Sequence, residues 1–408
     1  MKHFNATFWV KLSIANLFVV AAIGVLMRYK IGFSFPYFDQ KNIQHAHSHF
    51  AFAGWISQII MVLMVLYLQP LLSTKRLQAY QLILFANLFC AFGMLVSFAI
   101  QGYGFYSISF ATLCLLLSFV FSFFYFRDVS LSKHTVVKNW FRAALIFNII
   151  SSLGTASLVY MMATKHIEQH SYLSSLYWYL HFQYNGWFFF ACMGLLHSYL
   201  NRIKPAFNGS AKVFWLFAAS CIPAYGLSVL WIQIPVWLIV LIAIAAIAQF
   251  WGWVRFLLSI KSNSLMQNSK ADWLMKLLLA IVAFAATIKI SLQLGSTIPA
   301  VSKLAFGFRP IVIAYLHLVL LAVTSLFLIT YSYGSGLIKN NKLSIAGILF
   351  FVAGVFANEL VLAVQGIASF SYTMVPFINE VLLGVSIWML LSLLILLAAQ
   401  AMTNVTRN

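Results

Sequence analysis

The chain has 408 residues, of which 63% are hydrophobic and only 8% are charged, and its formal net charge is +19. A soluble domain has about 25% charged residues and roughly half apolar ones, so this composition excludes a soluble protein and predicts a multi-span membrane protein. Lys and Arg fall mostly in short links between apolar runs, where they orient spans and meet anionic lipid headgroups, so the positive charge does not indicate a nucleic-acid partner.

Long apolar runs recur along the whole chain. A helix needs about 20 mostly apolar residues to cross a bilayer, and by that measure the sequence predicts an all-α membrane bundle of about twelve spans. The expected spans are 8–27, 48–70, 79–100, 107–126, 141–162, 173–198, 211–231, 234–256, 273–293, 309–331, 343–365 and 376–400. Lys261–Asp272 is the most linker-like stretch, but spans can pack across it, so one transmembrane domain over 1–408 is expected.

The links between the predicted spans differ in their content of Lys and Arg. The links that follow even-numbered spans contain more of these residues than the links that follow odd-numbered spans. Positive residues concentrate on the cytoplasmic side, so the even links and both termini are expected to be cytoplasmic. The expected location is the inner membrane of a bacterium. The second, sixth and tenth spans then all run from outside to inside.

Histidines lie near the predicted outer face in these three spans. The triplet His45, His47 and His49 opens the second span. His181 and His317 lie about eight residues into the sixth and tenth spans, or ~12 Å below the outer surface. Imidazole is a common ligand of haem iron and of copper. The pattern predicts a haem or metal site, although a single buried histidine is more often a core residue and the triplet could be an interfacial cluster.

The spacing within the triplet separates its members. His45 and His49 are four positions apart and share one face of a helix, whereas His47 points nearly the opposite way. A haem with two histidine ligands needs one from each of two helices, and His317 and one histidine of the triplet are the expected pair. His45 and His49 could also hold a metal together, with His181 as a separate metal ligand.

Few other ionisable side chains lie in the predicted spans, where they are costly and often functional. Glu359 and Glu380 lie in or beside the last two spans, and Lys289 lies late in the ninth. We expect them to pair with one another, to bind haem propionates or to relay protons. Alternatively, Lys289 extends from its helix end to the membrane surface. His197, at the end of the sixth span, is expected to be solvated.

Twelve spans with histidines on the second, sixth and tenth resemble the catalytic subunit of haem-copper oxidases and nitric oxide reductases. The segment from His181 to Gly186 is similar to the sixth-span segment of nitric oxide reductases, in which a glutamate follows the histidine by four residues. Asn185 replaces that glutamate here. Oxidases often have a tyrosine at that place, and this chain has Tyr184 one position earlier. The histidine triplet resembles the second-span segment of the same family.

The tenth span carries the remaining likeness. Tyr315-Leu-His317 resembles the His-x-His motif of the family, with tyrosine in the first place. The resemblance implies a haem b on His317 and a second-span histidine, copper or non-haem iron beside His181, and a tyrosinate of Tyr315 as an unusual ligand of a second haem. It also implies a cytochrome or quinol as electron donor and O2 or NO as the gas ligand.

The family's ligand set is incomplete in this chain. The seventh predicted span has no histidine and the first histidine of the tenth-span motif is missing, so oxidoreductase turnover is left open. His-Ala-His at the start of a span is also similar to the NnrS family, which binds haem and copper and is linked to nitrosative stress. A secondary transporter without a cofactor, or a subunit that has lost its cofactors, is the other alternative, although transporters bind near the membrane midplane.

Overall fold

The computed structural model describes residues 4–205, 207, 209–263 and 272–402, and among them the side chains of 303–306 are left out. Over the described residues the chain is built from helices and contains no strand. This confirms the predicted all-α, polytopic membrane bundle. The linker-like stretch expected at Lys261–Asp272 lies largely outside the described residues.

Ten helical stretches in the described part of the chain are long and apolar enough to cross a membrane. They coincide with ten of the twelve expected spans. These stretches are Ala6–Gly32, Gln40–Leu71, Thr74–Gln101, Phe105–Leu131, Thr135–Thr164, Val236–Ser262, Trp273–Gly295, Arg309–Gly334, Lys342–Phe370 and Ile378–Ala401. The sixth expected span, 173–198, lies within helical elements that follow one another without a break from Gln169 to Ile203.

The seventh expected span, 211–231, is wrong. Its α-helix covers only Ala211–Cys221 and is followed by a short 3-10 helix at Pro223–Ser228. Pro223 has no N–H group and its ring clashes with the preceding turn, so the α-helix ends before it. Eleven residues rise only about 17 Å, well short of the ~30 Å hydrocarbon core. The sequence stays apolar beyond Pro223, so its hydropathy did not indicate where the helix ends.

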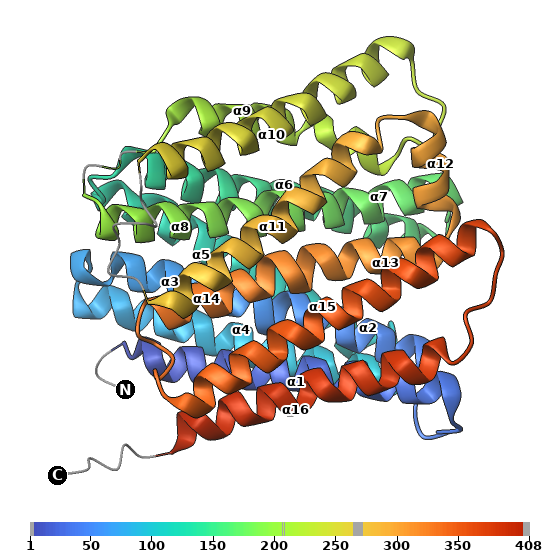
Figure 1. The fold of residues 1–408 in the computed structure, drawn as a ribbon, viewed down its shortest axis with the longest axis horizontal. Coiled ribbons are helices and arrows are strands. Elements are labelled where there is room, and N and C mark those ends of the chain that lie inside the picture. The colour runs from blue at the N-terminus through green and yellow to red at the C-terminus, as the bar shows by residue number, and fades with distance from the viewer. Residues whose placement is uncertain (1–3, 206, 208, 264–271, 403–408) are drawn as a thin grey trace. The chain divides into compact units, whose positions relative to one another are not determined.

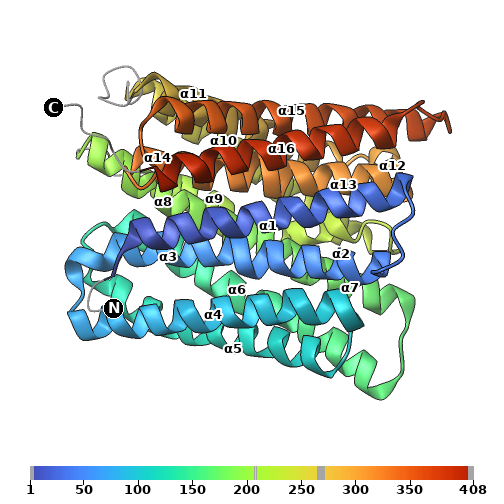
Figure 2. The same ribbon diagram turned by 90° about the horizontal axis from the view of Figure 1, so that it is seen from below.

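The structure divides into two compact units. That residues 1–408 form one transmembrane domain stays a prediction. The first unit consists of residues 1–121 and 328–408. Its elements are α1 (Ala6–Gly32), α2 (Gln40–Phe50), η1 (Ala51–Ser57), α3 (Gln58–Leu68), η2 (Gln69–Leu71), α4 (Thr74–Gln101), most of α5 (Phe105–Asp128), most of α14 (Leu326–Gly334), α15 (Lys342–Phe370) and α16 (Ile378–Ala401). α15 packs against α16 as its neighbour (Figure 1), and α16 packs against α1 (Figure 2). α1 also contacts α2 and α3.

The second unit consists of residues 122–327. Its elements are η3 (Val129–Leu131), α6 (Thr135–Thr164), α7 (Gln169–His181), η4 (Phe182–Phe188), α8 (Phe189–Ile203), α9 (Ala211–Cys221), η5 (Pro223–Ser228), α10 (Val236–Ser262), α11 (Trp273–Gly295), α12 (Pro299–Gly307), α13 (Arg309–His317) and η6 (Leu318–Ser325). α6 packs against the continuous helix of α7, η4 and α8, while α10 packs against α9 and α11 (Figure 1).

Polar residues outside the apolar runs determine where helices begin. The side chains of Asn5, Asp39, Ser73, Glu168, Ser210, Asp272 and Asn341 accept hydrogen bonds from the first backbone N–H groups of their helices. These N–H groups have no partner inside the helix, so each cap stabilises the first turn. Asp39 starts α2 at Gln40, earlier than the expected residue 48, so the histidine triplet lies inside the helix.

Candidate functional site

A π-helical segment follows the predicted ligand histidines in all three spans. η1 begins two residues after His49, η4 begins directly after His181, and η6 begins directly after His317. Among the described residues these are the π segments of the chain. π-helix is rare in proteins and is frequent at functional sites. The three histidine helices thus share one local feature.

The sequence around the histidines also repeats. His49-Phe-Ala-Phe-Ala-Gly54-Trp and His181-Phe-Gln-Tyr-Asn-Gly186-Trp share the pattern His-Phe-x-x-x-Gly-Trp. The stretch that follows His317 shares only the histidine, with Ala322 at the glycine position. This two-copy pattern is visible in the sequence, but the predictions above did not compare the two segments with each other. The glycine lies within the π segment in both copies.

The α2 triplet has the expected division of faces. His49 stacks on Phe98 with ring centres 4.3 Å apart, and the edge of His45 meets the Tyr103 ring at 4.7 Å. His49 Nε2 also lies 3.3 Å from the Tyr103 hydroxyl. His45 Nε2 is buried and has no hydrogen-bond partner among the described residues. His45 and His49 therefore share one aromatic environment.

His47 lies on the other side of α2. Its Cε1 atom is 3.5 Å from the position that a Cβ atom would take at Gly24 of α1. A Cβ atom there would be in ordinary van der Waals contact with the imidazole, so His47 faces α1. The structure thus confirms that His47 points away from His45 and His49.

Amide side chains stabilise the η1 segment. Asn16 of α1 donates a hydrogen bond to the Gly54 carbonyl at 2.6 Å, and Asn87 of α4 donates to the Ala53 carbonyl at 3.2 Å. Asn87 also donates to Oε1 of Gln58 at 2.7 Å. A π segment disturbs the regular backbone hydrogen bonds of a helix, and in an apolar interior each polar group needs a partner. Neighbouring helices supply partners here.

His181 belongs to a buried chain of hydrogen bonds. Its Nε2 lies 2.9 Å from the Cys221 carbonyl, and its Nδ1 lies 3.1 Å from Nδ2 of Asn185. The Lys289 ammonium donates to Oδ1 of Asn185 at 2.5 Å. A carbonyl only accepts and an amide nitrogen only donates, so His181 carries its proton on Nε2 and accepts at Nδ1. Both ring nitrogens are in use, which favours a polar wall residue over a metal ligand.

Lys289 does not extend to the membrane surface. It is only 6% exposed, and its ammonium lies 5.6 Å from the centre of the Phe189 ring as well as next to Asn185. An ammonium without water is stabilised by a hydrogen-bond acceptor and by an aromatic face. The alternative in which Lys289 reaches the surface from its helix end is therefore wrong.

A small cavity of about 50 Å³ adjoins this chain of hydrogen bonds. Lys289, Tyr184 and Thr324 are among the residues that line it, and most of the others are apolar. A cavity of this size has room for a water molecule or a diatomic gas. Two π segments contribute to its wall, η4 through Tyr184 and η6 through Thr324.

His317 has the hydrogen bond expected of a metal-binding histidine. Its Nδ1 lies 2.9 Å from the backbone carbonyl of Ile313, so Nδ1 carries the proton and a neutral ring is unprotonated at Nε2. Metal-bound histidines commonly adopt this arrangement. Two residues earlier, Tyr315 meets Tyr184 edge to face, with ring centres 6.3 Å apart. The structure thus brings together the two predicted site tyrosines.

The remaining predicted side chains have different surroundings. Glu359 is half-buried and accepts a hydrogen bond from Asn358 at 3.2 Å, whereas Glu380 is exposed in the first turn of α16. His197 was expected to be solvated, and this is wrong. It is 1% exposed, its Nδ1 lies 2.8 Å from the Met193 carbonyl, and aromatic rings, including that of Trp140, surround it.

The described residues contain no group of three His, Cys, Asp or Glu side chains that could hold a metal ion. The predicted copper or iron site at His181 therefore has fewer than three such ligands among the described residues. No family model matches this sequence, and no curated protein matches it.

Proposed function

We propose that this protein binds a b-type haem and acts in electron transfer or in the binding of O2 or NO. The observation that carries the proposal is the π segment that follows His49, His181 and His317 alike. Such segments cost regular hydrogen bonds and are common at functional sites, so three of them beside histidines support one shared site chemistry.

The chemistry of the donor residues fits a haem. His317 has its proton on Nδ1, which is the tautomer common among metal-bound histidines. The sequence pattern proposes one histidine of the triplet as the other ligand. His45 is a strong choice within α2, because its buried Nε2 has no hydrogen-bond partner among the described residues. The haem would supply the redox and gas-binding chemistry. The protein would be oriented in a bacterial inner membrane with both termini cytoplasmic, and a cytochrome or a quinol would donate electrons.

A dinuclear centre of haem and copper or iron fits less well. Both nitrogens of His181 are hydrogen-bonded, and α9 has no histidine that could complete a metal site. We therefore favour a haem protein in which Lys289, Asn185 and His181 form a chain of hydrogen bonds beside the small cavity. In that form the protein carries electrons or senses a gas, and does not reduce it at two metals.

Absorption spectroscopy of the detergent-purified protein tests this proposal. We expect a reduced b-type spectrum, confirmed by pyridine haemochrome quantification and metal analysis. His317→Phe should abolish it. The matched control is His197→Phe, because His197 also lies in a helix and bonds the carbonyl four residues before it. The control should keep the haem.

Single substitutions of His45, His47 and His49 then identify the second ligand. Only one of the three should change a low-spin spectrum to a high-spin spectrum. A colourless, metal-free and monodisperse wild-type protein would overturn the haem proposal. Stoichiometric copper with the haem would favour the NnrS-like alternative.

A secondary transporter is the second candidate, because one feature supports it. The helix α9 stops at Cys221 and continues as a 3-10 turn, and the Cys221 carbonyl accepts a hydrogen bond from buried His181. Transporters place substrate sites at such broken helices. Binding of a solute to the colourless protein, lost in His181→Phe, would establish this alternative.

A further inference from the structure

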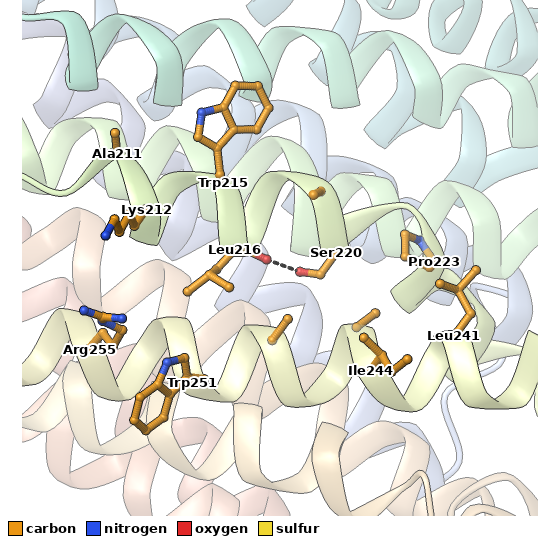
Figure 3. A pocket seen from close by; sticks show the side chains of 13 residues that line it. Ala211, Lys212, Trp215, Leu216, Ser220, Pro223, Leu241, Ile244, Trp251 and Arg255 are labelled. Carbon is orange, nitrogen blue, oxygen red and sulfur yellow. Dashed lines mark hydrogen bonds between the residues drawn. The ribbon is translucent and has the colours of Figure 1, made fainter.

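A long groove separates the outer sides of α9 and α10 in the second unit (Figure 3). Its volume is about 630 Å³. Small side chains, including Ala219, Ala245 and Ala248, line its middle. The two helices approach closely at Gly252, where a Cβ atom would lie 3.2 Å from Cβ of Leu216. The close packing and the small residues produce a narrow apolar channel that runs along both helices.

One end of this groove is cationic. Lys212 lies in the first turn of α9 and Arg255 lies near the end of α10, and Figure 3 shows both at the same end of the groove. Both side chains are exposed, and neither forms an ion pair within the described part of the chain. The far end, at Pro223 and Leu241, is apolar.

Two tryptophans flank the groove next to the cations, on the side toward its apolar middle. Trp215 and Trp251 are 62% and 52% exposed, and the Arg255 guanidinium lies 6.0 Å from the centre of the Trp251 ring. Tryptophan is enriched at the level of lipid headgroups, where one part of its ring is apolar and the other is wet. The tryptophans therefore place the boundary between headgroups and acyl chains next to the two cations.

We propose that this groove binds one anionic glycerophospholipid. The phosphate would lie between Lys212 and Arg255, and an acyl chain would follow the small residues toward Leu241. The groove is about 21 Å long from Arg255 to Leu241 at 1.5 Å per residue, which exceeds one leaflet of roughly 15 Å of hydrocarbon. A free phosphate ion would use the cations but not the apolar channel.

The orientation predicted from the Lys and Arg content supports an anionic lipid. Lys212 follows the link after the sixth expected span, which is expected to be cytoplasmic, and Arg255 lies at the same end of the groove (Figure 3). The cytoplasmic leaflet contains anionic lipids, and basic pockets between helices on that side bind their headgroups. The cationic end of the groove fits the headgroup of a lipid in that leaflet, and the apolar remainder of the groove fits an acyl chain.

Native mass spectrometry of the full-length protein with added phosphatidylglycerol or phosphatidylcholine of the same acyl chains tests the proposal. The wild type should bind one phosphatidylglycerol in preference to phosphatidylcholine. The double variant K212Q/R255Q should bind phosphatidylglycerol about thirtyfold more weakly. The double variant K342Q/R127Q removes a lysine from the start of α15 and an arginine from the end of α5, and should bind as the wild type does.

A third variant tests the channel itself. Ala248→Phe leaves both cations and should still reduce phosphatidylglycerol binding, because the ring fills the path of the acyl chain. Inorganic phosphate at the same concentration as the lipid should displace little of it, because phosphate gains nothing from the apolar channel. Equal binding of the two lipids by the wild type, or equal loss in both double variants, would overturn the proposal.

Discussion

Lys289 and Asn185 are 104 positions apart in the chain, yet Nζ of the lysine lies 2.5 Å from Oδ1 of the asparagine. The same amide donates from its Nδ2 to Nδ1 of His181. An asparagine can accept on one side and donate on the other, whereas an ionised glutamate could only accept. Asn185 therefore sets the tautomer of His181 while it stabilises the buried ammonium.

Substitution of Asn185 should show how much the buried charge of Lys289 lowers the free energy of unfolding when it has no acceptor. Asn185→Leu leaves the Lys289 ammonium without its acceptor, and we expect the free energy of unfolding to fall by about 3 kcal/mol. The double variant Asn185→Leu/Lys289→Met removes the buried charge as well, and should recover most of this loss. Thermal unfolding in detergent, followed by circular dichroism, measures both. Equal destabilisation of the single and double variants would contradict the pairing.

Part of this site could be predicted from the sequence. Composition and apolar runs predicted ten of the long helices, and the spacing of His45, His47 and His49 predicted their two faces, because a helix has a fixed period. The contact between Lys289 and Asn185 could not be predicted, because no local pattern connects residues on different helices.

Two predictions were wrong, one for a local reason and the other because of contacts between distant segments. The seventh span failed because hydropathy stays high through Pro223, although proline removes the backbone N–H that the helix needs. His197 was expected in water because it lies near a helix end. The rings of Trp140, Phe207 and Phe256 cover it, and they come from other segments of the chain.

Gly186 should be intolerant of a side chain. A Cβ atom there would lie 2.5 Å from Cβ of Phe147 on α6, so Gly186→Ala must push α6 and η4 apart. We expect a loss of about 1–3 kcal/mol of stability. Gly384→Ala is the matched control, because Gly384 lies within α16 with nothing within 4 Å of the added Cβ atom. It should raise stability by about 0.5–1 kcal/mol. Thermal unfolding of both variants tests the close approach of α6 to η4.

Hydroxyl groups should stabilise the third π segment. Thr324 donates to the Val319 carbonyl five residues earlier at 2.8 Å, which is the spacing of a π turn. Thr324→Val should cost about 1 kcal/mol and speed hydrogen exchange over residues 319–325. In Thr112→Val the lost bond is to the Ile108 carbonyl in exposed α-helix, and little change is expected. Equal effects of the two substitutions would show that the π turn does not depend on this hydroxyl.

Low pH should destabilise the first turn of α7. The Glu168 carboxylate caps this helix, and hydrogen bonds from Ser171, through its side chain and its backbone, lower the pKa of Glu168. Because the pKa is lower in the folded state, the cap stabilises the helix above the unfolded pKa, and this is lost as the pH falls through the folded pKa. Amides of residues 170–172 should exchange faster below pH 4.5, after correction for intrinsic rates. Glu168→Gln should remove that pH dependence.

The π segments make the direction of each histidine depend on the number of residues in its helix. One extra residue in a helical turn rotates everything beyond it by about 100°, since an α-helix has 3.6 residues per turn. The part of each helix that carries the histidine is therefore out of phase with the part that follows. A one-residue deletion within η4 would turn His181 away from the Cys221 carbonyl while α8 kept its packing. The number of residues between each histidine and the packed half of its helix thus determines the direction of the imidazole. Substitutions alone do not alter that number.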